Sequence, residues 1–179
     1  MKRNLINFIL FQIGWFACVL SAANQIALIG LIVAVFIMFI HIQISSNRNS
    51  EILLLITAMV IGAIWDSAIV LIGWLSYESG MFSPYFAPYW IIAMWGLFAT
   101  TVNISLSWMK DKILLAAIFG GVAGPLAYYA GFKLGAVNIN NFDMAMISLS
   151  IGWAFFTPLL LKFTDFFRKR SEINMREAL

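Results

Sequence analysis

The sequence predicts an all-α fold, a polytopic membrane bundle of six transmembrane helices with both termini in the cytoplasm. Of its 179 residues, 63% are hydrophobic and only 11% are charged, whereas about a quarter of the residues of a soluble domain are charged. Six apolar stretches approach the length of about 20 residues that a helix needs to cross a bilayer. When six spans alternate in direction, ten of the 11 Lys and Arg residues fall on one side of the membrane.

The whole chain is predicted to form one integral membrane domain, residues 1–179, in which polar turns separate the spans. Asn24 and Gln25 mark a tight turn after the first span, and a charged turn at 110–112 follows the fourth. The longer connection at 76–88 is rich in Tyr and Phe, so we expect it to lie at the membrane interface. The predicted spans are residues 5–23, 26–44, 52–75, 89–109, 113–133 and 144–163, followed by a basic cytoplasmic tail at 164–179.

Positive charge sets the predicted orientation, because Lys and Arg accumulate in cytoplasmic loops. Lys133 is the one cation predicted on the outer side. A second interpretation treats the first span as a signal peptide that ends in the small residues 21–23, and its cleavage would leave five helices. Gln12 and Trp15 suit a retained, packed span better. The cations predicted on the cytoplasmic side are Lys2, Arg3, Arg48, Lys110, Lys112, Lys162, Arg168, Lys169, Arg170 and Arg176.

The composition excludes several kinds of site. A single His and a single Cys cannot by themselves form a zinc site, a disulfide or an iron–sulfur cluster, so no metal and no cofactor are expected. The net charge of +3 is too small and too scattered for nucleic-acid binding. We expect His41 to lie at the interface near the cytoplasmic end of the second span, and Cys18 to be a packed, inert thiol.

Asp66 is the most informative residue, because an ionised carboxylate near the bilayer centre costs at least a few kcal/mol. It is the one carboxylate expected inside the membrane, since the other acids fall near the surfaces. Gly62, Asp66, Ile69 and Gly73 share a helix face on which the glycines would let a neighbouring helix approach. Two interpretations stay open: a structural group bonded to a neighbouring helix, or a carboxylate that handles a ligand, an ion or a proton.

Small and polar residues along one face of the fourth span predict close helix packing or, alternatively, the wall of a polar cavity. The Gly and Pro residues of the fifth span predict either a packing kink or a broken helix that marks a binding site. Pro125 and Pro158 each remove a backbone donor, and we expect them to kink their helices. The residues predicted to serve packing or kinks are Gly62, Gly73, Gly96, Thr100, Asn103, Gly120, Gly121, Gly124, Pro125, Gly131 and Pro158.

Helical depth places Tyr128 and Tyr129 near Asp66, which predicts an outward-facing cavity with a polar floor and aromatic walls. Lys133 follows one turn further out, where its side chain either snorkels to the surface or turns inward. No catalytic residue is assigned, since no nucleophile paired with a base is visible. The residues predicted to line this cavity or bind its ligand are Asp66, Trp65, Trp95, Tyr128, Tyr129, Lys133, Ser150, Trp153 and Thr157.

The string Gly-Pro-Leu-Ala-Tyr-Tyr at 124–129, the segment 62–66 and Pro-Tyr-Trp at 88–90 resemble an uncharacterised family of small bacterial inner-membrane proteins. This family is classed as the domain of unknown function twenty-eight seventy-eight, and the resemblance covers nearly the whole chain. It implies a bacterial inner-membrane location. Genes for fatty-acyl modification and flavin-dependent oxidation often neighbour the family's genes, which implies a link to envelope-lipid metabolism or stress. The resemblance implies no particular site residue.

Together these features favour a non-catalytic membrane component that binds or hands on a lipid-like or small amphipathic molecule. Its expected partners are membrane lipids and other envelope-lipid enzymes, and not nucleic acid. The alternatives are a small secondary transporter or channel, since the spans divide into three plus three, a membrane-embedded enzyme that uses Asp66 and a Tyr, and a purely structural role. A lateral opening between helices would favour lipid binding, whereas a fully hydrogen-bonded Asp66 in a closed core would favour structure.

Overall fold

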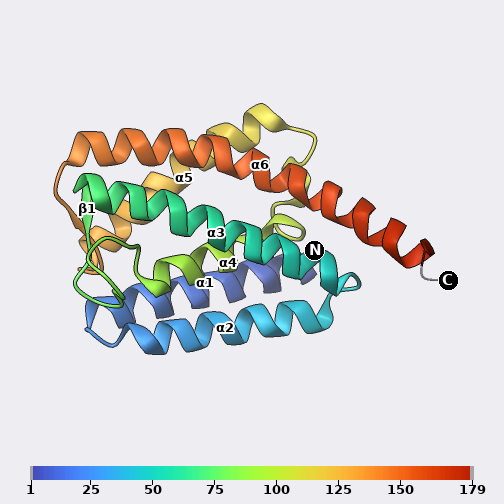
Figure 1. Ribbon diagram of the computed structural model, residues 1–179, viewed down its shortest axis with the longest axis horizontal. Helices are drawn as coiled ribbons and strands as arrows, with labels where there is room; N and C mark the ends of the chain where they lie inside the picture. Colours follow the sequence, from blue (N-terminus) through green and yellow to red (C-terminus); the bar gives the residue numbers. More distant parts are fainter. Residues whose placement is uncertain (1, 178–179) are drawn as a thin grey trace.

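The chain forms a bundle of six α-helices in the computed structural model, which describes residues 2–177 and their side chains up to residue 170 (Figure 1). Five helices are long and apolar enough to cross a membrane, and α4 is shorter. The predicted all-α bundle of six helices is therefore confirmed. The helices are α1 (Lys2–Ala23), α2 (Ala27–Ile44), α3 (Arg48–Ile72), α4 (Tyr89–Val102), α5 (Ile113–Lys133) and α6 (Phe142–Glu177).

Successive helices run in opposite directions, so the N-terminus and the end of α6 lie at the same end of the bundle (Figure 1). We call this the terminal end, and it also holds the α2–α3 turn and residues 103–112. The opposite end, called the loop end, holds the α1–α2 turn and residues 73–88 and 134–141. Two short strands that the sequence does not predict, β1 (Leu75–Ser76) and β2 (Asn138–Ile139), pair antiparallel at the loop end. Their pairing satisfies backbone groups outside the helices.

Local chemistry explains where several helices begin and end. The side chain of Asn47 accepts a hydrogen bond from the backbone N–H of Ser50 and caps the start of α3. Gly73 ends α3 with a φ of 83°, a left-handed conformation that favours glycine. Gln25 also has a positive φ, of 63°, in the tight turn that the sequence predicts between α1 and α2.

The short helix α4 is the buried centre of the bundle. It packs against α1, α2 and α3, and most of its side chains are buried. Its 14 residues rise about 21 Å, less than the thickness of the hydrocarbon core of about 30 Å. The helix is also shorter than the predicted span 89–109, because turns and a short 3₁₀ helix (Ser107–Met109) follow Val102. Such irregular backbone is tolerated at membrane depth when protein covers it.

Hydrogen-bonding side chains account for the early end of α4. The hydroxyl of Ser105 donates to the side chain of Asn7, and the hydroxyl of Ser107 donates to the backbone carbonyl of Ile104. Side-chain bonds of this kind compete with the backbone bonds of a helix.

Helix α6 is longer than its predicted span. It continues through most of the predicted basic tail to Glu177, and residues 178–179 of that tail lie outside the described residues. Pro158 lies inside α6 and Pro125 inside α5, and both helices continue on either side of the proline. The two helices pack most extensively against each other, which leaves the inner face of α5 open toward α1 and α4.

Candidate functional site

Asp66 lies in a closed, hydrogen-bonded core. Its side chain is fully buried, and its carboxyl oxygens accept hydrogen bonds from Trp95 Nε1 at 2.7 Å and from the hydroxyl of Tyr128 at 2.5 Å. The three residues belong to α3, α4 and α5, so one carboxyl group joins three helices. Gly62 makes room for this contact, since a Cβ added there would lie 2.1 Å from the Trp95 ring. This geometry favours the structural interpretation of Asp66.

Tyr77 lies near the same cluster, in the connection that follows β1. Its side chain is buried, and its hydroxyl has no hydrogen-bond partner among the described residues. Burial raises the pKa of Tyr77 well above its usual range, and the charge of Asp66 adds to the effect. The phenol therefore stays protonated at neutral pH. The sequence predicts only an interfacial connection around Tyr77, and its contact with the core is not predicted.

A cavity of about 450 Å³ lies between α1, α4, α5 and α6, next to the Asp66 cluster. Ligand pockets in proteins typically measure about 300 to 1,000 Å³, so the cavity is large enough for a ligand. It occupies the space that the one-sided packing of α5 on α6 leaves open. Phe8 of α1 and Phe119 and Leu126 of α5 line the cavity and are also exposed on the outside of the bundle. The cavity therefore opens sideways between α1 and α5, where the bundle would face lipid.

Aromatic side chains form much of the cavity wall. The rings of Trp95 and Trp153 stack with their centroids 4.4 Å apart, and Phe98 meets Trp153 edge-on at 5.0 Å. Two further tryptophans, Trp15 and Trp90, also line the cavity. Gly124 allows Trp153 to lie close against α5, since a Cβ added at Gly124 would be 2.2 Å from the indole. One wall of the cavity is thus built by the packing of α6 onto the glycines of α5.

Four of the nine residues predicted to line a cavity lie in this wall, namely Trp95, Tyr128, Trp153 and Thr157. The other five lie elsewhere. Asp66 is bonded to Trp95 and Tyr128 and is not itself part of the wall.

The remaining four residues of that predicted set face other parts of the molecule. Trp65 packs against Gly152 and Phe156, and the backbone of Ser150 contributes to the α5–α6 contact. Tyr129 and Lys133 lie toward the loop end, where the Lys133 ammonium is 5.3 Å from the centre of the Tyr129 ring. Lys133 is exposed, so its side chain does not turn inward to Asp66. Helix periodicity predicts the face of each residue but not the helix that the face meets.

The glycines predicted to serve helix packing divide into two groups. A Cβ added at Gly62, Gly96, Gly120 or Gly124 would come within 2.4 Å of a neighbouring helix, and one added at Gly121 would come within 3.2 Å. Gly73 and Gly131 make no such close approach, since Gly73 ends a helix and Gly131 has only ordinary contact with Val137. Thr100 and Asn103 take part in hydrogen bonds at the terminal end of α4.

Polar side chains without protein partners are a further property of the cavity wall. The amide of Gln12, the indole N–H of Trp153 and the hydroxyl of Thr157 have no hydrogen-bond partner among the described residues. The Trp153 and Thr157 atoms are covered by neighbouring side chains, whereas Gln12 is half-buried. In the sequence, Gln12 is only a sign of a packed span, and nothing in one sequence shows that it faces a cavity.

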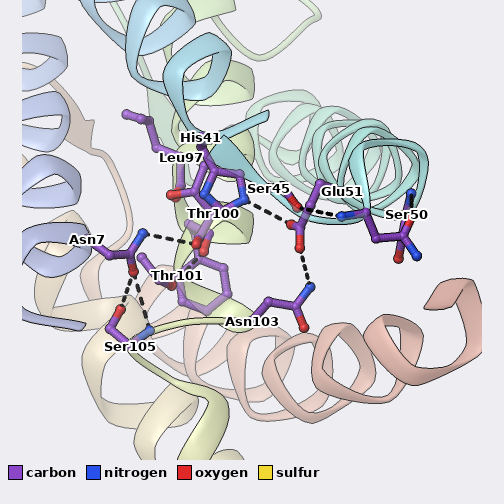
Figure 2. A network of polar contacts seen from close by, with 12 residues as sticks. Asn7, His41, Ser45, Ser50, Glu51, Leu97, Thr100, Thr101, Asn103 and Ser105 are labelled. Carbon is purple, nitrogen blue, oxygen red and sulfur yellow. Dashed lines mark hydrogen bonds and ion pairs between the residues drawn. The ribbon is translucent and has the colours of Figure 1, made fainter. Parts of the chain in front are cut away.

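A second polar cluster, shown in Figure 2, lies at the terminal end of the bundle. Glu51 is buried there, and its carboxylate contacts His41 Nε2 at 2.9 Å and accepts a hydrogen bond from Asn103 Nδ2 at 2.9 Å. Lys110 donates to the carbonyl oxygen of the Asn103 side chain at 3.0 Å and pairs with Asp165 at 3.4 Å. Glu51 is thus a second buried carboxylate, and it lies at the end of the bundle, in the first turn of α3. His41 is also buried, in the last turn of α2.

Comparison with known proteins assigns the chain to a family and adds no activity. Among the described residues, no three His, Cys, Asp or Glu side chains lie close enough together to hold a metal ion. No curated protein matches the chain, and no solved structure does. A family model described as a protein of unknown function (DUF2878) matches residues 4–159, most of the chain. The chain therefore belongs to the uncharacterised DUF2878 family.

Proposed function

We propose that the protein is a multi-pass protein of the bacterial inner membrane that binds a lipid-like molecule between α1 and α5 without catalysing a reaction. The observation that carries this proposal is the lateral opening of a cavity of about 450 Å³ with aromatic and apolar walls. A lipid could enter such a cavity from the bilayer without crossing an aqueous phase. The family resemblance extends the proposal to a lipid of envelope metabolism or stress, received from or passed to other envelope-lipid enzymes.

The geometry at Asp66 argues against the enzyme alternative. A catalytic carboxylate must reach the reacting atoms of its substrate at hydrogen-bonding distance. Both carboxyl oxygens of Asp66 are instead occupied by Trp95 and Tyr128, and the side chain is fully buried. Asp66 thus supports the wall of the cavity from behind. In the proposed function, its role is to hold Trp95 and Tyr128 in the orientation that shapes the site.

Blocking the cavity from α5 tests the proposal. The side chain of Ala123 lines the cavity, so Ala123→Phe places a ring inside it. Val122, on the same helix turn, does not line the cavity and is 55% exposed, so Val122→Phe places the same ring on the outer face. Each protein is extracted gently from its membrane, and its bound lipids are identified by native mass spectrometry and lipidomics.

We expect the wild type and Val122→Phe to retain a lipid species enriched over its share of the membrane, and Ala123→Phe to lose it. Recovery of phospholipids in bulk proportions from the wild type would contradict the proposal. Equal enrichment in the wild type and Ala123→Phe would place the lipid elsewhere on the protein.

A further inference from the structure

We propose that the cavity selects an uncharged lipid and holds that lipid's polar group deep in the membrane, at the side chain of Gln12. This inference rests on the proposed lipid-binding function and adds the chemical class of the ligand. The ligand consists of a long apolar part and a small head that carries a carbonyl or hydroxyl group. Long-chain alcohols and diacylglycerols share this chemistry.

The absence of charge in the cavity wall excludes a charged head group. Every described residue that lines the cavity is apolar or uncharged at neutral pH, with no Asp, Glu, Lys, Arg or His among them. A phosphate or ammonium group drawn into this wall would lose its water without gaining a partner of opposite charge, which is strongly unfavourable. Asp66 offers no counter-charge, because its carboxyl group is enclosed by its own hydrogen-bond donors. A charged lipid could therefore insert only its tail.

Gln12 supplies the polar contact at depth. It lies ten residues after Lys2 and eleven before Ala23, the two ends of α1, and is therefore about 15 Å from either end. Gln12 lines the cavity, and its amide has no hydrogen-bond partner among the described residues. In hydrocarbon an unpartnered amide is unfavourable by about 1 to 3 kcal/mol. A ligand carbonyl can accept from this amide, and a ligand hydroxyl can also donate to it.

Polar contact is also what selection requires in a membrane. A lipid tail that moves from the bilayer into an apolar cavity changes one apolar environment for another, so the hydrophobic effect contributes little to its binding. The shape of the cavity and its hydrogen bonds must then distinguish one lipid from the excess of other lipids around the protein. Because Gln12 is the half-exposed polar side chain at mid-depth, we infer that it makes the distinguishing contact.

The tryptophans of the cavity provide the readout. Four of the seven tryptophans line it, namely Trp15, Trp90, Trp95 and Trp153, so a brominated ligand bound there quenches a large part of the protein fluorescence. The full chain is placed in phosphatidylcholine nanodiscs and titrated with a brominated diacylglycerol, a brominated long-chain alcohol and a brominated phosphatidylglycerol. Gln12→Leu removes the amide, and Gln12→Met removes it while keeping an unbranched side chain. Gln43→Leu makes the same exchange at an exposed position outside the cavity.

We expect saturable quenching by at least one of the two uncharged probes and only weak, non-saturating quenching by phosphatidylglycerol. Both Gln12 variants should bind the uncharged probe about fivefold more weakly, as expected for the loss of one neutral hydrogen bond, whereas Gln43→Leu should match the wild type. Equal binding of phosphatidylglycerol, or unchanged binding by folded Gln12→Met, would overturn the inference while leaving lipid binding in place. If no probe quenches the wild type saturably, the proposed function itself fails.

Discussion

Asp66 illustrates how one buried carboxyl group can hold a membrane bundle together. Its two oxygens accept hydrogen bonds from a tryptophan and a tyrosine of different helices, so each polar group satisfies another away from water. Trp95 and Tyr128 also line the cavity, which couples the order of the core to the shape of the site. A residue that the sequence marks as functional by its rarity is thus explained by the support it gives to its neighbours.

Removal of one donor from this cluster should destabilise the protein. Tyr128→Phe takes away the hydroxyl that binds Asp66 and leaves a buried oxygen without a partner, so we expect a loss of about 1 to 3 kcal/mol in the free energy of unfolding. Unfolding in mixed micelles of increasing denaturing detergent measures it. Tyr129→Phe is the matched control, because the Tyr129 hydroxyl makes no hydrogen bond with the described residues. Equal stability of the two variants would show that the Asp66–Tyr128 contact contributes nothing.

For a single residue, the sequence predicts the helix face on which the side chain lies better than it predicts the residues that the side chain contacts. Asp66 interrupts an apolar span, and Gly62 lies one helical turn before it on the same face. This pattern correctly predicts that a neighbouring helix approaches closely, as α4 does through Trp95. The pair of His41 and Glu51 is missed, although the sequence holds a signal for it. His41 lies near the end of one helix and Glu51 near the start of the next, so a tight antiparallel turn brings them together.

Among the helices, α5 gives the molecule its cavity. Its glycines bring it close to α6 on one side, while its small residues leave space on the side of α1 and α4. The sequence predicts this small-residue face, but it offers two interpretations, a packing kink and part of a binding site. Both hold at once, since Gly120 and Gly124 pack against Thr157 and Trp153 and also line the cavity. Helix periodicity cannot separate them, because contact and wall lie on adjoining faces of one helix.

The close approach of α5 to α6 predicts a difference between two glycines of the same helix. An added Cβ at Gly124 would lie 2.2 Å from Trp153, so Gly124→Ala should displace the indole and destabilise the protein by about 1 to 3 kcal/mol. At Gly131 the nearest atom is 3.4 Å away, so Gly131→Ala should be neutral or stabilising by up to about 1 kcal/mol, since alanine favours helix. Detergent unfolding compares the two variants. A stable Gly124→Ala would mean that α5 and α6 can separate without loss.

For the whole molecule, the count of six helices and their alternating directions follow from hydropathy and charge alone. Hydropathy does not predict how far each helix extends across the membrane. The fourth helix is too short to cross a bilayer by itself, and the chain completes that segment with turns which α1 and α3 help to satisfy through Asn7 and Glu51. The two-stranded pair at the loop end escapes prediction for a similar reason, because two residues per strand produce no periodic pattern.

The short α4 makes membrane topology the decisive test of the architecture. If α4 crosses with the other helices, Ser83 before it and Asp111 after it lie on opposite sides of the membrane. The sole native thiol, Cys18, is fully buried, so Cys18→Ala provides a background into which single cysteines are introduced. Because ten of the 11 cations belong to the side of Asp111, the rule that positive loops stay inside places Asp111 in the cytoplasm.

In intact cells, a membrane-impermeant maleimide should therefore label Ser83→Cys, whereas Asp111→Cys should react only after permeabilisation. Asn49→Cys, in the first turn of α3, should behave like Asp111→Cys, and Asn140→Cys like Ser83→Cys, because the structure places these pairs at the same ends of the bundle. Labelling of Ser83→Cys and Asp111→Cys from one side would mean that α4 enters and leaves the same face. The cavity would then open toward a different depth of the bilayer, and Gln12 would lose the position at mid-membrane from which its selectivity is argued.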